Sequence, residues 1–222
     1  VTFSYAHVPS ILPRQKILEN LGFPAAEDKA KMYENAYKKF TKAGYVAIGM
    51  DHFCRPDDEF FIALNNNQLH RNFQGYCTTK TTGQVYGFGA SSISQLFSAY
   101  SQNVKNAAQY IKKINEKNTA VLRGYKLDKN EKIIRDIINS IMCNYYVDFS
   151  EISEKFKTDI VSIKKIINFS EESLRDFTDL NIMEIKNDKI TISHDARLFI
   201  RNIAMKFDPQ LSKKIGTYSK TI

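Results

Sequence analysis

One stretch of the sequence, Ile48-Gly-Met-Asp-His-Phe-Cys-Arg-Pro-Asp-Asp58, concentrates side chains that could do chemistry. His52 and Arg55 are candidate cationic or proton-transferring groups. Three carboxylates of the same stretch could orient them or accept protons: Asp51, Asp57 and Asp58. Capping of the next helix would explain the last two carboxylates without any function, and we favour that interpretation for them. For Asp51, His52 and Arg55 as a group we favour a functional role.

A second stretch, His70-Arg-Asn-Phe-Gln-Gly-Tyr76, places His70 and Arg71 beside two aromatic rings. Arg71 offers a planar fork that suits a carboxylate or phosphate, and Phe73 and Tyr76 offer flat apolar faces to a ring. A loop whose aromatic side chains pin it to the core would have the same composition. Both interpretations therefore stay open.

Neither stretch predicts a metal site. Asp51 and His52 are adjacent, so in a strand their side chains would point to opposite faces, and no other His or Cys lies at a helical spacing from either. The three cysteines, Cys54, Cys77 and Cys143, are widely spaced and include no Cys-x-x-Cys. This pattern suggests neither a disulfide framework nor a zinc site, and it favours a reducing compartment.

Strands and helices alternate around these stretches. Short apolar runs predict strands at 1–6, 45–50 and 85–90. The spacing of apolar residues predicts helices at 27–43 and 57–64, and Ser91 or Ser92 is a candidate N-cap for a helix from Ile93 onward. Such alternation is typical of parallel βα units, whose ligands collect at the carboxyl ends of the strands. About three strands are too few to close an eight-stranded barrel, so we predict an α/β fold with a partial parallel βα barrel over residues 1–103.

The sequence pattern changes near Val104. An amphipathic helix is predicted from Val104 to Ile114, and Asp128-x-x-Glu131 is a capping-box pattern ahead of an apolar run that reaches Tyr145. Further elements are predicted downstream: helices at 149–156, 159–169 and 171–180, a hairpin at 182–192 and a last helix from about Asp195. We therefore predict a mostly helical, winged-helix-like domain over residues 104–222.

The chain of 222 residues carries a formal net charge of +8 and has an isoelectric point near 9.2. That charge favours an anionic partner such as nucleic acid, phosphate or a polycarboxylate, without choosing among them. No apolar run approaches the roughly 20 residues of a membrane span. The start, Val1-Thr-Phe-Ser-Tyr-Ala6, lacks a methionine and a signal-peptide pattern and begins as if inside a strand, so we expect a piece of a longer protein.

Four strings of the chain resemble consecutive signatures of the oxygen-independent coproporphyrinogen III oxidases. They are Tyr5-Ala-His-Val-Pro9, Ile48-Gly-Met-Asp-His-Phe-Cys-Arg-Pro-Asp-Asp58, Leu69-His-Arg-Asn-Phe-Gln-Gly-Tyr76 and Arg201-Asn-Ile-x-Met-x-Phe-Asp208. Their order and spacing agree over essentially the whole chain, and the second and third strings are long enough to be specific. The related haem-chaperone branch typically has a tryptophan at the third string, and this chain has no tryptophan.

The resemblance implies a radical S-adenosylmethionine oxidoreductase of haem and porphyrin biosynthesis. Such enzymes oxidatively decarboxylate two propionates of coproporphyrinogen III to vinyl groups, giving protoporphyrinogen IX. They hold a [4Fe-4S] cluster on a Cys-x-x-x-Cys-x-x-Cys loop near the N-terminus and need an electron donor for it. That loop is absent here. We therefore expect this chain to supply the later barrel strands and the C-terminal domain, to hold no metal and to be inactive alone.

Two cofactor contacts of the family map onto the chain by this resemblance. Ala6, at the end of the first predicted strand, and Ile93 are both expected beside S-adenosylmethionine. The four carboxylates of the substrate would give the basic stretches a purpose, and as a hypothesis we assign substrate binding to His52, Arg55, His70 and Arg71. The catalytic residues stay unknown. We expect a cytoplasmic monomer that binds neither nucleic acid nor a membrane.

Two alternatives stay open. A winged-helix protein that binds nucleic acid is suggested by the net charge and by the hairpin with Lys186 and Lys189, although no downstream helix is densely packed with Arg and Lys. A non-catalytic carrier of haem or porphyrin would share the fold and would differ in having no activity on coproporphyrinogen III.

Overall fold

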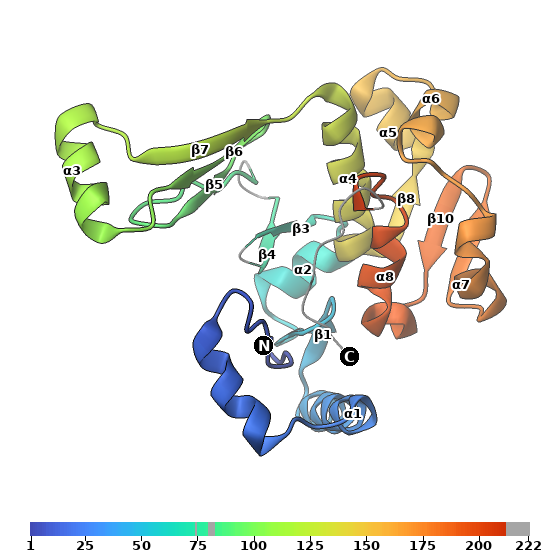
Figure 1. Cartoon of the computed structure of the whole chain (residues 1–222). Coiled ribbons are helices and arrows are strands. Elements are labelled where there is room, and N and C mark those ends of the chain that lie inside the picture. The colour runs from blue at the N-terminus through green and yellow to red at the C-terminus, as the bar shows by residue number, and fades with distance from the viewer. Residues whose placement is uncertain (74, 80–82, 212–222) are drawn as a thin grey trace. The chain divides into compact units, whose positions relative to one another are not determined.

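The computed structural model describes residues 1–73, 75–79 and 83–211 (Figure 1). These residues form two compact units, one of Val1–Ile62 with the described residues after Pro209, and one of Ala63–Pro209. Gln74 of the second basic stretch and the end of the predicted C-terminal domain, 212–222, lie outside the described residues.

The first unit contains a 3-10 helix, one long α-helix and a hairpin of two short strands. Its elements are η1 (Pro13–Leu21), α1 (Ala26–Lys42), β1 (Val46–Ile48), β2 (His52–Cys54) and the start of α2 (Glu59–Asn65). The predicted apolar face of α1 packs on the hairpin, since the ring centroids of Phe40 and Phe53 lie 4.8 Å apart. Gly44, with φ +85°, follows the helix in the left-handed backbone region that favours glycine.

The second unit is built around one central helix, α4 (Lys129–Asn144), which contacts strands and helices from several parts of the chain. Its three antiparallel sheets have the strand orders β3-β4, β5-β6-β7 and β8-β10-β9. The strands are β3 (Leu69–Asn72), β4 (Gly75–Thr78), β5 (Ile93–Gln95), β6 (Ala99–Asn103), β7 (Val121–Lys126), β8 (Tyr146–Asp148), β9 (Met183–Lys186) and β10 (Lys189–Ile192). The remaining helices are α3 (Ala107–Lys117), α5 (Phe149–Phe156), α6 (Ile160–Ile166), η2 (Glu172–Leu174), α7 (Arg175–Asp179), η3 (His194–Leu198) and α8 (Ile200–Met205).

Helix α4 forms where the sequence predicts it, and for the predicted reasons. The Asp128 carboxylate accepts the Glu131 N–H at 2.8 Å, and the Glu131 carboxylate accepts the Asp128 N–H at 2.9 Å, so the capping box is present. Ile133, Ile137 and Ile141 are fully buried along one face. Each such side chain contributes roughly 1.5–3 kcal/mol when it leaves water, so this face anchors the second unit.

The hairpin predicted at 182–192 is also confirmed, as β9 and β10 with a turn at Asn187 and Asp188. Both turn residues have positive φ, the backbone that a two-residue hairpin loop requires. The downstream helices are present as α5, α6, η2 with α7, and η3 with α8. Strand β8, which pairs with β10, was not predicted.

Three strand and helix predictions are wrong. Residues 1–6 and 85–90 are not strands, apart from a single bridge between Val85 and Gln95. Ile93 begins strand β5 rather than a helix, and the hydroxyl of Ser92 donates to the Gly89 carbonyl at 2.7 Å instead of capping a helix. Gly87 explains why, because a Cβ there would lie 2.7 Å from the Ile93 carbonyl oxygen. A neighbouring extended backbone therefore packs directly against Ile93.

The predicted parallel pairing is not found within the described residues, where every strand pair is antiparallel. Loops of three residues join β1 to β2 and β5 to β6, which suits hairpins, whereas parallel strands need crossovers of about a dozen residues or more. The overall class is nonetheless a mixture of helices and strands. Sheet β5-β6-β7 spans the predicted domain boundary at 103/104, and that boundary stays a prediction.

Within the described part, no helix is long and apolar enough to cross a membrane.

Candidate functional site

The first basic stretch forms the β1-β2 hairpin and the turn that follows it. His52 begins β2, and its Nδ1 lies 2.6 Å from the Asp51 carboxylate, with both side chains about one-fifth exposed. A carboxylate at Nδ1 orients the imidazole ring and favours one of its tautomers. Asp51 was one of the three carboxylates that could orient His52, and it is paired with His52 in the structure.

The other charged residues of that stretch are more exposed. Arg55 lies 3.4 Å from the Asp57 carboxylate, and both side chains are at least three-quarters exposed. The Asp58 carboxylate accepts the Phe60 N–H at 2.9 Å at the start of α2, so the capping interpretation is confirmed for Asp58. The pairing of Arg55 in solvent contributes little energy, and its guanidinium stays accessible.

Ala6 lies in an irregular segment of the first unit, not at the end of a strand. Its carbonyl accepts a hydrogen bond from the Gln15 side chain at 3.0 Å. The same segment is joined to the basic hairpin by the Thr2 N–H, which donates to the Asp51 carbonyl at 2.7 Å. Ala6 and His52 therefore belong to adjoining segments of one unit.

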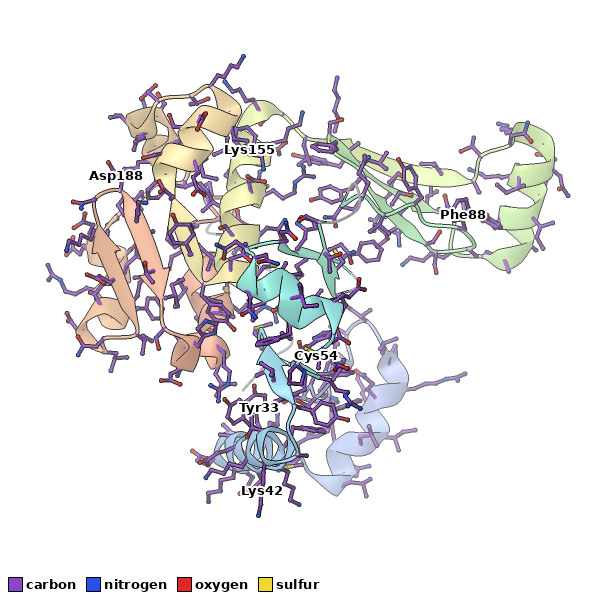
Figure 2. The ribbon with its side chains drawn as sticks, turned by 180° about the vertical axis from the view of Figure 1, so that it is seen from behind. Tyr33, Lys42, Cys54, Phe88, Lys155 and Asp188 are labelled. Carbon is purple, nitrogen blue, oxygen red and sulfur yellow. The ribbon has the colours of Figure 1, made fainter. Side chains whose placement is uncertain are left out.

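His70 lies on β3 in the second unit and is half-buried. Burial lowers its pKa from the ordinary value of 6.5, and the nearby cations Arg135 and Lys155 lower it further, against the opposite influence of Asp136. Lys155, labelled in Figure 2, also forms an ion pair with Asp136 at 2.8 Å. His70 is therefore neutral at neutral pH and would meet an anion as an N–H donor, not as a cation.

Arg71 and Tyr76 lie opposite each other on β3 and β4. The guanidinium carbon of Arg71 lies 5.4 Å from the centre of the Tyr76 ring, and the Tyr76 hydroxyl donates to the Met142 carbonyl at 3.3 Å. Tyr76 is only 7% exposed, so it is a core residue that supports Arg71 and does not offer a face to a ligand. Phe73 is 46% exposed and keeps that role open. The buried Nε of Arg71 has no hydrogen-bond partner among the described residues.

Ile93, on β5, lines a hollow of about 350 Å³ together with residues of β6 and β7. Its neighbours in that hollow include Tyr100, Gln102, Arg123 and Tyr125. None of these four was predicted as a site residue. A larger hollow, of about 780 Å³, lies beside α7 and the β9-β10 hairpin, but four carboxylates line it and none of the predicted site residues does.

The predicted site residues thus fall into two sets. Ala6, His52 and Arg55 belong to the first unit, and His70, Arg71 and Ile93 belong to the second. Within the second unit, sequence reasoning also missed Arg135 of α4, which acts on His70 and lies 5.9 Å from the centre of the Tyr100 ring. A charged residue inside the apolar pattern of α4 was the only signal of it.

The cysteines do not fit a metal cluster. Burial raises the pKa of all three thiols, and that of Cys143 to about 12, whereas metal ligation needs the thiolate. All three are free, and nowhere in the described part do three His, Cys, Asp or Glu side chains gather as a metal site. An iron–sulfur cluster therefore has no ligand set among these residues.

Comparison with known proteins finds relatives that share one name. The chain is 34% identical over 218 residues to the oxygen-independent coproporphyrinogen III oxidase of Salmonella typhimurium. This alignment covers 96% of this chain and 46% of the relative. It is 34% identical over 224 residues to the enzyme of the same name from Thermostichus vulcanus, covering 99% of this chain and 67% of the relative. No protein-family model matches the chain.

One solved structure is similar throughout. Coproporphyrinogen III oxidase (HemN) from Escherichia coli, a radical SAM enzyme, superposes with a TM-score of 0.82 at 34% identity, covering 92% of this chain and 46% of that chain. The chain therefore spans about half the length of the Salmonella typhimurium and Escherichia coli enzymes. With two-thirds of the Thermostichus vulcanus relative covered at 34% identity, the chain belongs to the oxygen-independent coproporphyrinogen III oxidase family.

Proposed function

We propose that this chain is the C-terminal part of an oxygen-independent coproporphyrinogen III oxidase and that it forms one wall of the substrate pocket. The full enzyme would convert two propionates of coproporphyrinogen III to vinyl groups, each losing CO₂, one hydrogen atom and one electron. What supports the proposal is the similarity along nearly the whole chain, together with cationic or N–H-donating side chains in each unit. We also propose that residues 1–103 form a partial parallel βα barrel only together with further polypeptide, because the described residues alone contain only antiparallel pairs.

His52 and Arg55 in one unit, and His70 and Arg71 in the other, are the residues that we propose for holding propionates. Arg71 is the strongest of the four, because its guanidinium is fixed over Tyr76 and no carboxylate forms an ion pair with it in the described part of the chain. A guanidinium favours the ionised form of a carboxylate and fixes its direction. His70, being neutral, would add one N–H donor without adding charge.

S-adenosylmethionine, with electrons delivered through a cluster, would supply the radical that removes hydrogen from the substrate. By the family resemblance, we propose Ile93 of the second unit and Ala6 of the first unit as contacts of S-adenosylmethionine. Among the described residues no ligand set suits the cluster, so we propose that its ligands lie upstream. We also propose that the full enzyme is a cytoplasmic monomer that takes electrons from a donor protein.

A measurement of S-adenosylmethionine cleavage tests whether the cluster ligands lie upstream of this chain. After anaerobic reconstitution with iron and sulfide, the 222-residue chain should release no 5′-deoxyadenosine, whereas the longer protein that includes the upstream region should release it. The upstream sequence should contain Cys-x-x-x-Cys-x-x-Cys. Cofactor cleavage by the 222-residue chain alone, or an upstream region without that motif, would refute the proposal.

A further inference from the structure

One face of sheet β5-β6-β7 carries an unexplained group of side chains. Ile93 pairs with Gln102, and Gln102 with Arg123, while Tyr100 pairs with Tyr125 two residues along. Residues directly opposite each other share a face of the sheet, and so do residues two apart on one strand. These five side chains therefore lie on the same face, around the hollow of about 350 Å³.

The guanidinium of Arg123 is held in place on this face. Its Nε and one terminal nitrogen donate to the Gln102 side-chain oxygen at 3.0 and 2.6 Å. Those two bonds use one edge of the planar fork and leave the other terminal nitrogen for a ligand. An arginine already oriented in this way loses less conformational freedom when it binds.

A second guanidinium, that of Arg135 on α4, lies beside the Tyr100 ring of this face but does not itself line the hollow. Arg135 donates to the carbonyls of Leu96 and Phe97 at 3.1 and 2.7 Å, and its central carbon lies 5.9 Å from the Tyr100 ring centre. Figure 1 shows α4 following β7 at one end of this sheet, with α3 at the other end. Helix α4 also packs against β3, the strand of His70 and Arg71. Arg135 is also close enough to His70 to lower its pKa, so this guanidinium lies near a residue that we propose for substrate binding.

Neither Arg123 nor Arg135 forms an ion pair with any carboxylate in the described residues. Two carboxylates of α4 have other partners: Glu131 accepts from Tyr125 and from the Asp128 N–H, and Asp136 pairs with Lys155. Two positive charges beside two tyrosine rings favour a ligand in which a carboxylate is attached to a flat ring. A pyrrole bearing a propionate has this chemistry.

We infer that this face of β5-β6-β7 binds one propionate-bearing edge of the tetrapyrrole, with Arg123 and Arg135 holding the carboxylate and Tyr100 packing beside the ring. This inference rests on the proposed function, because it names a further part of the same substrate pocket. The methionine carboxylate and adenine of S-adenosylmethionine share the chemistry, so the test must separate the two ligands.

The test is a fluorescence titration of the 222-residue chain with coproporphyrin III, the stable oxidised form of the substrate. Arg123→Gln should raise the Kd about tenfold, because it removes one charge-assisted contact. Lys117→Gln removes the same charge from the exposed end of α3 and should change the Kd by less than about twofold. Arg135→Gln should act in the same direction as Arg123→Gln, and unfolding temperatures control for folding, since Arg135 also bonds two backbone carbonyls.

A second titration uses mesoporphyrin IX, which has two carboxylates where coproporphyrin III has four. The Arg123→Gln variant should lose most of the preference that the unmodified chain shows for the tetracarboxylate. Equal binding of coproporphyrin III by Arg123→Gln and the unmodified chain would overturn the inference while leaving the proposed function standing. A variant that weakens the binding of S-adenosylmethionine but not of coproporphyrin III would also overturn the inference and leave the proposed function standing. Absence of coproporphyrin III binding by the unmodified chain would overturn the inference for this chain, whereas the proposed function fails only if the longer protein does not act on coproporphyrinogen III.

Discussion

The two units of the chain differ sharply in how they bury apolar side chains. In Ala63–Pro209, Ile133, Ile137 and Ile141 of α4 are fully buried among further core residues. In Val1–Ile62, the buried apolar residues are few, Ile48 and Cys54 among those described, while Phe3, Ile17 and Leu21 are at least 70% exposed. A buried apolar core therefore stabilises the second unit, whereas the first unit buries few apolar side chains of its own.

This contrast bears on function. A unit that exposes so much apolar surface is suited to being covered by more polypeptide, and the chain spans about half the length of the Salmonella typhimurium relative. The second unit has its own core, and β3 with His70 and Arg71 packs against that core. We therefore expect the second unit to tolerate little change in its interior and the first unit to be insensitive to truncation of the same kind of side chain.

The largest expected effect comes from the core of α4. Ile137→Ala should lower the free energy of unfolding by about 3 kcal/mol, because it leaves a cavity in a fully buried site. The matched change Ile17→Ala, at a side chain that is 70% exposed, should cost less than about 0.5 kcal/mol. Urea unfolding followed by circular dichroism measures both. Similar losses for the two variants would remove the distinction between the units.

Substitution of Asp148 should have the next largest effect on the free energy of unfolding. Its side chain is 6% exposed and accepts hydrogen bonds from the Ser150 N–H and the Tyr146 hydroxyl, while Lys189 lies 2.7 Å away. The hydrogen bond from Lys189 is the largest of the causes that lower its pKa from 3.8 to about 2. Asp148→Asn should cost about 1–2 kcal/mol at pH 7, less than the full linkage value because Lys189 is half exposed and screened. Asp195→Asn, at a side chain that is 93% exposed, should leave the unfolding temperature unchanged.

The sign of the pH dependence follows from the lowered pKa of Asp148. Between about pH 2 and 4 the unfolded chain holds a proton on this carboxylate that the folded chain does not, so stability rises with pH across this window. The contribution is complete above the ordinary pKa of 3.8 and is lost as the pH falls through about 2. Asp148→Asn should flatten this part of the stability curve. An unchanged acid limb in the variant would show that other carboxylates produce it.

Substitutions of Arg71 and Arg55 allow a direct comparison of the two basic stretches. In the longer enzyme, Arg71→Ala should raise KM for coproporphyrinogen III about tenfold with a smaller change in kcat, since a contact to an unreacting propionate stabilises substrate and transition state alike. Arg55→Ala should change KM by no more than about threefold, because its side chain is 75% exposed and already pairs with Asp57. Unchanged kinetics in Arg71→Ala would remove Arg71 from the substrate site.

His70 should give the smallest effect. Because its pKa is lowered by burial, the unfolded chain binds more protons just below pH 6.5, so folding stability decreases as the pH falls through that region. His70→Gln should reduce the slope of unfolding temperature against pH between about pH 5 and 6.5, while Arg135, Lys155 and Asp136 stay in place. Thermal scans at several pH values measure the slope. A slope equal to that of the unmodified chain would exclude His70 as its source.

The sequence predicted best those elements whose patterns are local. The capping box and apolar face determined α4, and the turn residues determined the β9-β10 hairpin. Strand β7 was missed because all six of its residues are exposed, so no alternation of apolar and polar residues marks it. The helix predicted from Ile93 failed because Ile93, Leu96, Phe97 and Tyr100 have helical spacing, while pairing with β6 and the close approach of Gly87 favour an extended backbone.

For the site, the sequence identified clusters but not their neighbours. It marked His70 and Arg71, yet it gave no sign that Tyr76 is buried beneath Arg71 or that burial keeps His70 neutral. Arg123 and Arg135 lie far along the chain from both stretches, and only strand register and helix packing bring them to one face. Such contacts depend on tertiary structure and have no local sequence pattern.

The most direct test of the proposed role is the anaerobic conversion of coproporphyrinogen III by the longer protein that contains these 222 residues. With S-adenosylmethionine and a reductant, protoporphyrinogen IX should form with release of two CO₂ per molecule, and the 222-residue chain alone should form none. A longer protein that cleaves S-adenosylmethionine but leaves coproporphyrinogen III intact would contradict the assignment of this chain to the substrate wall of such an oxidase.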